Sequence, residues 1–120
     1  MKVAISCKAK SLAAEVDARF GRAAYFCIYD VETDNYSFVD NQLSSNSPSG
    51  AGVQAAQAIV DSGVSAVLTG HCGPKAFRAL VAAGIKVYAD VAGTVQEAVS
   101  ALRNNELAPA TIANADGHWE

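Results

Sequence analysis

The feature that most constrains the fold is a helix-glycine-strand pattern that occurs twice in the second half of the chain. One copy passes through Gly63 into the β-branched run Val64–Thr69, and the next passes through Gly84 into Ile85–Ala89. Glycine suits the end of a helix because it adopts left-handed backbone conformations at little cost. Short apolar strands that alternate with helices are typical of parallel βα units. This half of the chain therefore predicts an α/β fold.

Three helices are predicted in the same half, beginning near residue 51, at Pro74 and at the capping box Thr94–Glu97. Apolar residues at helical spacing define the face that each helix should bury. These residues are Val53, Ala56 and Val60 in the first helix, Phe77, Leu80 and Val81 in the second, and Ala98, Val99 and Leu102 in the third.

The first half predicts three strands. A short apolar run covers residues 2–6, and two β-rich runs at 24–31 and 36–43 are joined by a turn-forming segment, which indicates a hairpin. The stretch 44–52 is rich in Ser and Gly and predicts a mobile loop. Right-handed crossovers then give a mixed five-stranded sheet in the order 3-2-1-4-5, with strand 2 antiparallel and helices on both faces.

Composition bounds the class of protein. The chain has 120 residues, of which 51% are hydrophobic, enough for one core, and no apolar run approaches the length of a membrane span. The beginning of the chain lacks the pattern of a secretion signal. Three cysteines, Cys7, Cys27 and Cys72, fit reduced thiols better than a disulfide framework. A net charge of −3 argues against nucleic-acid binding. We therefore expect a single-domain cytoplasmic protein that binds neither nucleic acid nor membrane.

The segment Gly70–Pro74 is the strongest candidate for chemistry. It lies where a strand ends and a helix begins, and the N–H groups and positive end of a helix attract anions. In the predicted sheet order strands 1 and 4 are neighbours, and ligands of open α/β sheets bind beyond the carboxyl ends of such strands. Basic residues after strand 1 would form the opposite wall of a positively charged mouth. These residues are Lys8, Lys10, Arg19 and Arg22.

Cys72 has more than one interpretation. A thiol at a helix N-terminus should have a lowered pKa, which would let it and His71 act as soft-metal ligands. A lone cysteine can equally be a small hydrophobe that fills a gap in the core. The string His71-Cys72-x5-Arg78 also matches the motif of cysteine-dependent phosphatases, although Phe77 within it has the spacing of a helical core residue.

A series of landmark residues runs along most of the chain in a fixed order. They are Asp17, Arg19, Phe20, Gly21, Arg22, Asn41, Gly50, Gly52, Gly70, Gly73, Pro74, Ala76, Leu80, Gly84, Ile85, Val87 and Tyr88. This pattern resembles the dinitrogenase iron-molybdenum cofactor biosynthesis family, which includes NifX-like and NafY-like proteins. The resemblance covers residues 1–107 as a cluster-binding domain and leaves 108–120 as a C-terminal tail. It implies a ribonuclease H-like fold.

The resemblance also implies that the protein is a carrier and not an enzyme. Its cargo would be a molybdenum-containing metal-sulfide cluster, either similar to the iron-molybdenum cofactor or a molybdenum-copper-sulfide cluster, delivered to a recipient protein. Cys72 and His71 are the candidate metal ligands. The implied binding residues, together with the two lysines of the predicted mouth, are Lys8, Lys10, Arg19, Phe20, Gly21, Arg22, Gly70, His71, Cys72, Gly73 and Pro74. Alternatives are a phosphatase, or a scaffold without ligand that docks a partner through residues 44–52.

Overall fold

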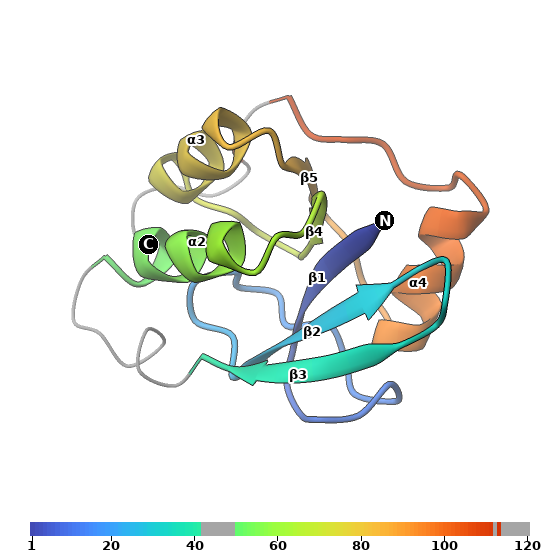
Figure 1. Cartoon of the computed structure of the whole chain (residues 1–120). Coiled ribbons are helices and arrows are strands. Elements are labelled where there is room, and N and C mark those ends of the chain that lie inside the picture. The colour runs from blue at the N-terminus through green and yellow to red at the C-terminus, as the bar shows by residue number, and fades with distance from the viewer. Residues whose placement is uncertain (42–49, 112, 114–120) are drawn as a thin grey trace.

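The computed structural model describes residues 1–41, 50–111 and 113, and its five strands form one mixed sheet in the order β3-β2-β1-β4-β5 (Figure 1). The strand β1 runs antiparallel to β2 and parallel to β4. The predicted order and the antiparallel direction of the second strand are therefore confirmed. The strands are β1 (Lys2–Cys7), β2 (Tyr25–Asp30), β3 (Tyr36–Asp40), β4 (Ala66–Leu68) and β5 (Lys86–Tyr88). The predicted end of the third strand at 42–43, and most of the predicted mobile loop, lie outside the described residues.

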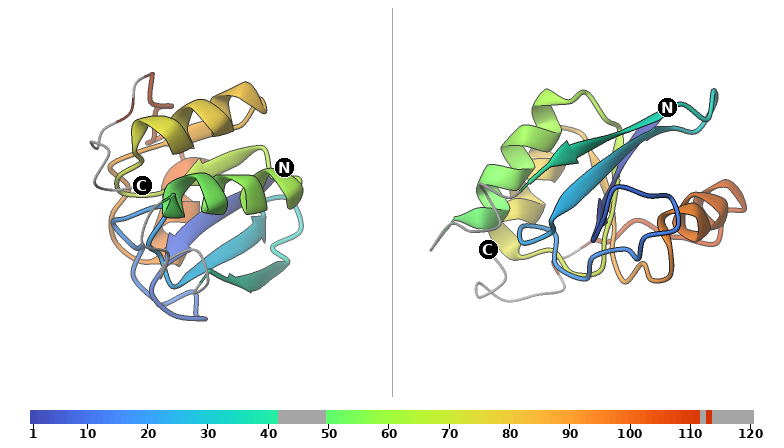
Figure 2. Two further views of the ribbon diagram at one scale, coloured as in Figure 1. Left: turned by 90° about the vertical axis from the view of Figure 1, so that its left-hand side faces the viewer. Right: turned by 90° about the horizontal axis from the view of Figure 1, so that it is seen from below.

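Helices cover both faces of the sheet, as predicted. Two of them, α2 (Ala51–Asp61) and α3 (Pro74–Ala82), lie side by side on one face, and α4 (Val95–Arg103) lies on the other (Figures 1 and 2). The capping box that starts α4 is present, because the Glu97 N–H donates to Thr94 Oγ1 (3.1 Å) and the Thr94 N–H donates to Glu97 Oε1 (2.9 Å). These bonds satisfy N–H groups that have no partner within the helix.

The two layers have separate cores. Successive side chains of a strand point to opposite faces, so Ala4 of β1 packs with the core under α2 and α3. Its neighbours Val3 and Ile5 pack with the core under α4. All three side chains are fully buried. The sheet is thus buried on both faces along β1, which is its central strand.

The predicted inner faces of α2 and α3 are partly wrong. Val53 is 41% exposed and Val81 is 50% exposed, whereas the buried residues of α2 are Ile59 and small ones such as Ala51, Ala55 and Ala56. The reason is that α2 packs against α3 and shares a core with the sheet. Small side chains let two helix backbones approach closely, and Val53 and Val81 then remain on the solvent side.

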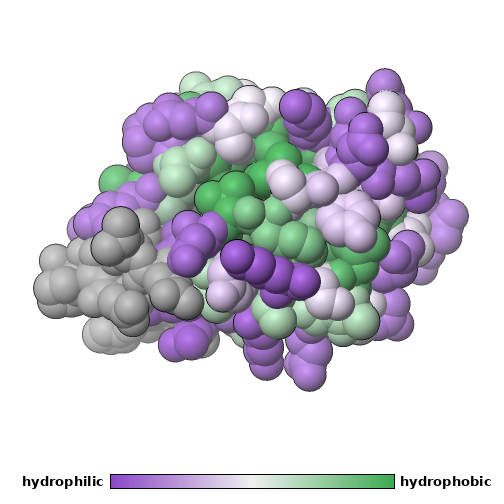
Figure 3. Space-filling view, turned by 60° about the horizontal axis from the view of Figure 1, so that its bottom comes forward, coloured by the Kyte–Doolittle hydropathy of each residue, from purple (hydrophilic) through white to green (hydrophobic). Residues whose placement is uncertain are grey.

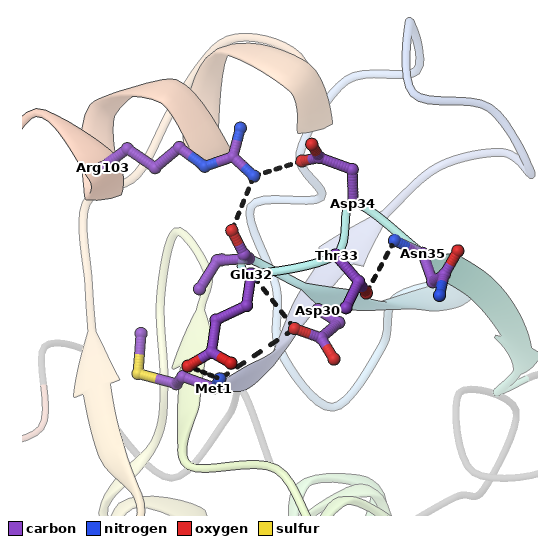
Figure 4. A network of polar contacts seen from close by, with 8 residues as sticks. Met1, Asp30, Glu32, Thr33, Asp34, Asn35 and Arg103 are labelled. Atoms are coloured by element: carbon purple, nitrogen blue, oxygen red, sulfur yellow. Dashed lines mark hydrogen bonds and ion pairs between the residues drawn. The ribbon is translucent and has the colours of Figure 1, made fainter.

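The hairpin turn between β2 and β3 is tied to α4 (Figure 4). Arg103 Nη2 donates to the Val31 carbonyl oxygen (2.8 Å) and to the Asp34 carboxylate, which also accepts a hydrogen bond from the Tyr29 hydroxyl (2.7 Å). The hydrogen bond from Arg103 lowers the pKa of Asp34 below its ordinary value. The N-terminal ammonium group of Met1 adds an ion pair with the same turn.

The end of the described chain contacts the outer edge of β5. The Ala110 N–H donates to the Val87 carbonyl oxygen (2.7 Å), and Ala110 and Ala113 pack against the core under α2 and α3. The first residues of the predicted tail therefore contact the sheet. Within the described part of the chain, none of the helices has the length and hydrophobicity required to cross a membrane.

A candidate anion site between two loops

Two loops meet at the carboxyl ends of β1 and β4. Arg19 and His71 form a parallel β-bridge, in which the His71 N–H donates to the Ala18 carbonyl oxygen (2.6 Å) and the Phe20 N–H donates to the His71 carbonyl oxygen (3.0 Å). One loop follows β1 and the other connects β4 to α3. The structure therefore brings Arg19 beside the Gly70–Pro74 segment through main-chain bonds.

Glycine is required where these loops are closest. A Cβ on Gly70 would lie 2.7 Å from both the Cα and the carbonyl oxygen of Ala18. A Cβ on Gly21 would lie 2.6 Å from the Cα of Gly52 in the first turn of α2. Any larger residue at either position would push two backbone segments apart. The first loop is thus held between the β4-α3 loop and the start of α2.

A buried polar residue of the landmark pattern, which the predicted set of binding residues does not include, supports the first loop. Asp17 is 8% exposed, and its Oδ1 accepts a hydrogen bond from the Arg19 N–H (3.1 Å). The Ser6 hydroxyl donates to the Asp17 carbonyl oxygen (2.8 Å) and lies 2.7 Å from the Thr69 hydroxyl. Ser6 and Thr69 are polar residues at the ends of two apolar runs, and that position is the sequence signal that could have revealed them.

Asn41 supports the same loop from the other side. Its side-chain amide donates to the carbonyl oxygens of Gly21 (3.2 Å) and Ala23 (2.9 Å), and the residue is only 5% exposed. Asn41 belongs to the landmark pattern, but we had not assigned it to the site. Its position directly after β3 fixes the loop to the end of that strand.

Only two of the four basic residues predicted to form one wall of the site lie in the first loop. Lys8 pairs with Glu15 (3.4 Å), and the ammonium of Lys10 lies over the ring of Tyr25 at 5.4 Å from its centroid. Residues 12–16 bond to the beginning of α4 and the turn before it, and this carries both lysines to the α4 side of the sheet. Arg19, which is exposed, and Arg22, which is half-buried, remain in the first loop.

Two predicted binding residues have packing roles. Phe20 and Cys72 are each 1% exposed and lie in the core under α2 and α3, where the rings of Phe20 and Phe26 pack at a tilt of 53° with their centroids 5.2 Å apart. Cys72 thus matches the interpretation as a small hydrophobe. His71 beside it is half-buried. Among the described residues, no three His, Cys, Asp or Glu side chains form a group suited to a metal ion.

The other two cysteines belong to the opposite core, under α4. Burial raises the pKa of Cys7 to about 11 and that of Cys27 to about 12. Both thiols therefore keep their protons at neutral pH, and protonated thiols are poor metal ligands and poor nucleophiles.

The phosphatase motif does not form a phosphate loop. The helix α3 begins at Pro74, so most of the spacer between Cys72 and Arg78 is helical, and Phe77 from that spacer is 9% exposed. The catalytic loop of such phosphatases must wrap N–H groups around the anion, and a regular helix directs these groups along its axis instead. The motif therefore lies mostly in a helix and does not have the geometry of a phosphate-binding loop.

The arrangement is suited to holding an anion. Both α2 and α3 begin after glycine, at Gly50 and Gly73, and both helices start at the same end of the molecule (Figure 1). Their positive ends flank the loop that carries Arg19 and Arg22. Helix N-termini and guanidinium groups attract negative charge without a covalent bond or a dedicated metal ligand.

Comparisons with known proteins identify relatives of this chain. A family model described as dinitrogenase iron-molybdenum cofactor matches residues 1–105. The apo form of the orange protein from Desulfovibrio gigas is 42% identical, with a TM-score of 0.93 over 95% of this chain and 96% of that one. A Thermotoga protein provisionally assigned as a NifB protein is 38% identical, with a TM-score of 0.81 over 95% of this chain and 97% of that one.

A more distant structure shares the fold alone. It is a provisionally assigned dinitrogenase from Methanocaldococcus jannaschii, 18% identical, with a TM-score of 0.71 over 93% of this chain and 96% of that one. A search of curated proteins finds no significant match. The family model spans nearly all of the described domain, including both loops of the candidate site. This protein therefore belongs to the dinitrogenase iron-molybdenum cofactor family.

Proposed function

We propose that this protein binds and carries an anionic, molybdenum-containing metal-sulfide cluster in the cytoplasm and passes it to a recipient protein, without catalysing a reaction. The observation that carries the proposal is the β-bridge between Arg19 and His71, which joins the two loops beside the positive ends of two helices. Family membership and the similarity to the orange protein support it.

The chemistry of the loops fits such a cargo. A thiometallate cluster carries several negative charges on soft sulfur atoms, which accept hydrogen bonds from guanidinium and main-chain N–H groups. Arg19 and Arg22 would provide the charge, and the segment Gly70–Pro74 would provide the surface against which the cluster lies. Because these contacts are not coordination bonds, the cluster could be released without breaking a metal-protein bond.

Titration with tetrathiomolybdate tests the proposal. We expect a change in its visible charge-transfer absorption on binding, and weaker binding as salt is raised, because salt screens charged contacts. Changing Arg19 or Arg22 to Gln should weaken binding about tenfold each, which corresponds to about 1.4 kcal/mol. The matched control is Lys86→Gln, which removes an exposed positive charge at the start of β5. Equal affinity of all these variants and the wild type would contradict the proposed site.

A cysteine variant separates charge-based binding from metal ligation. Cys72 is buried in an apolar core, so we expect Cys72→Ala to lower stability but to keep the affinity for tetrathiomolybdate. Cys27→Ala, in the opposite core, is the control for the loss of a buried thiol. A folded Cys72→Ala protein that no longer binds, beside a Cys27→Ala protein that does, would make Cys72 a ligand.

A further inference from the structure

The first loop of the candidate site contains a negative charge among its positive ones. Asp17 is 8% exposed, and its Oδ1 accepts the hydrogen bond from the Arg19 N–H (3.1 Å). Within the described part of the chain, no lysine or arginine forms an ion pair with this carboxylate. Burial of a charge without a partner of opposite sign is unfavourable. The chain therefore keeps an unfavourable carboxylate two residues from an arginine of the candidate site.

The hydrogen bond to the Arg19 N–H does not require a charge at position 17. Asparagine makes the same turn as aspartate, because its side-chain oxygen accepts a main-chain N–H two residues further on. The Asp17 N–H also donates to the Ser6 carbonyl oxygen (2.8 Å), and the Ser6 hydroxyl donates to the Asp17 carbonyl oxygen (2.8 Å). Neither of these bonds involves the carboxylate. A neutral side chain with an acceptor oxygen would thus hold the loop equally well.

The charge of Asp17 acts beyond the residue itself. Among the described residues, only its Oδ1 accepts a hydrogen bond, and none of their fully buried side-chain oxygens lacks a partner. The second oxygen, Oδ2, is therefore not completely buried. The charge also reaches a neighbouring side chain: burial is the main cause of the raised pKa of Cys7, and the negative charge of Asp17 adds to it. The carboxylate is thus able to act on another charge held nearby.

An anion held by Arg19 would lie within reach of this charge. The carboxylate is bonded to the main-chain nitrogen of Arg19, so roughly the length of one arginine side chain separates it from an anion on the guanidinium. That length is comparable to the Debye length, about 10 Å at 0.1 M salt. Figure 3 brings forward the side on which the first loop lies in Figure 1, and hydrophilic side chains border an apolar area on that face. Charges beside apolar surface are screened less than charges in bulk water, so the repulsion should affect affinity.

We propose that Asp17 makes the cargo site discriminate by charge, because it lowers the affinity for an anion in proportion to the negative charge of that anion. This inference rests on the proposed function, since it concerns an anion held by Arg19. Arginines alone would favour the most highly charged anion available. With a fixed negative charge beside them, the site prefers an anion whose charge is spread over many atoms, as in a metal-sulfide cluster. The same repulsion keeps the affinity low enough for the cargo to pass to a recipient.

Two thiometallates of the same shape and different charge test this inference. Tetrathiomolybdate is a dianion and tetrathioperrhenate is a monoanion, and both are tetrahedral. Asp17→Asn keeps a side-chain oxygen for the Arg19 N–H but removes the charge. At low salt we expect this variant to bind tetrathiomolybdate about tenfold more tightly than wild type and tetrathioperrhenate about threefold more tightly, because the repulsion that is removed is proportional to the charge of the ligand. Both gains should shrink as salt is raised.

The control is Asp61→Asn, which makes the same chemical change at the last residue of α2, the end of that helix away from the site, and should leave both affinities unchanged. Asp17→Ser is a second neutral variant, because a serine hydroxyl can accept the same hydrogen bond. Urea unfolding shows which variants are folded.

The outcomes separate this inference from the proposed function. If neither the wild type nor the folded neutral variants bind either anion at low salt, the proposed function is wrong and the role of Asp17 falls with it. If the wild type binds, but the folded neutral variants gain no affinity or gain it equally for the two anions, the role of Asp17 alone is wrong. A gain that is larger for the dianion and shrinks with salt supports it.

Discussion

At the scale of single residues, Gly70 marks the point where the two walls of the candidate site touch. A Cβ there would lie 2.7 Å from main-chain atoms of Ala18, which cannot move aside as a flexible side chain could. We therefore expect Gly70→Ala to lower the free energy of unfolding by about 2 to 3 kcal/mol. It should also weaken tetrathiomolybdate binding, because the bridge between Arg19 and His71 would separate. Urea unfolding and the visible titration measure the two effects.

Gly84 provides the control for this substitution. It has a positive φ of 79°, but a Cβ there would have no atom within 4 Å. Gly84→Ala should lower the free energy of unfolding by only about 1 kcal/mol, through backbone strain, and leave the affinity for tetrathiomolybdate unchanged. If both alanine variants bound with wild-type affinity, the close contact at Gly70 would have no role in the site.

At the scale of elements, the capping box of α4 makes a measurable contribution. Thr94→Ala removes the hydroxyl that accepts the Glu97 N–H, and we expect a loss of about 1 kcal/mol in the free energy of unfolding. Thr94→Ser keeps the hydroxyl and should lose less than half as much. Chemical denaturation of both variants checks this, and equal losses would show that packing of the threonine methyl group dominates.

The boundaries and order of the elements could be predicted because local chemistry determines them. Pro74 begins α3, the capping box begins α4, and the helix-glycine-strand pattern with right-handed crossovers gives the sheet order. The buried face of α2 could not be predicted in the same way. Its sequence places apolar residues on two sides, with Val53 on one and Ile59 on the other, and only the packing against α3 decides which side is buried.

The candidate site was predictable to a similar extent. The topology rule for neighbouring parallel strands correctly placed the loops after β1 and β4 together. The directions of Lys8 and Lys10 depend on how residues 12–16 fold back onto the start of α4, and that segment has no periodicity to indicate it. The burial of Cys72 is likewise a packing result, because a thiol suits a core and a surface equally well in sequence.

At the scale of the whole molecule, two buried thiols should make the free energy of unfolding fall as the pH becomes alkaline. The folded state raises the pKa of Cys7 to about 11 and of Cys27 to about 12, from 9.0. The folded protein therefore holds these protons more tightly than the unfolded chain, and the resulting stability is present below pH 9 and is lost as pH rises toward the folded values. We expect the titration of Cys27 alone to lower the free energy of unfolding by about 2 kcal/mol at about pH 10.5.

Urea unfolding between neutral pH and about pH 10.5 measures this loss. Cys27→Ala should be less stable than wild type at neutral pH because it leaves a cavity, but its stability should fall less steeply with pH. Parallel profiles for the two proteins would show that other groups cause the alkaline loss.

The side chain of Asn41 gives the molecule a property beyond holding a loop in place. It joins the carbonyl groups of Gly21 and Ala23 to the end of β3, so the loop that carries Arg19 and Arg22 is anchored to a strand. An anion that binds only when this loop is in place would therefore also hold the two hydrogen bonds closed. Thermodynamic linkage then requires reciprocity: the factor by which opening of these bonds lowers the affinity for the anion equals the factor by which the bound anion disfavours their opening.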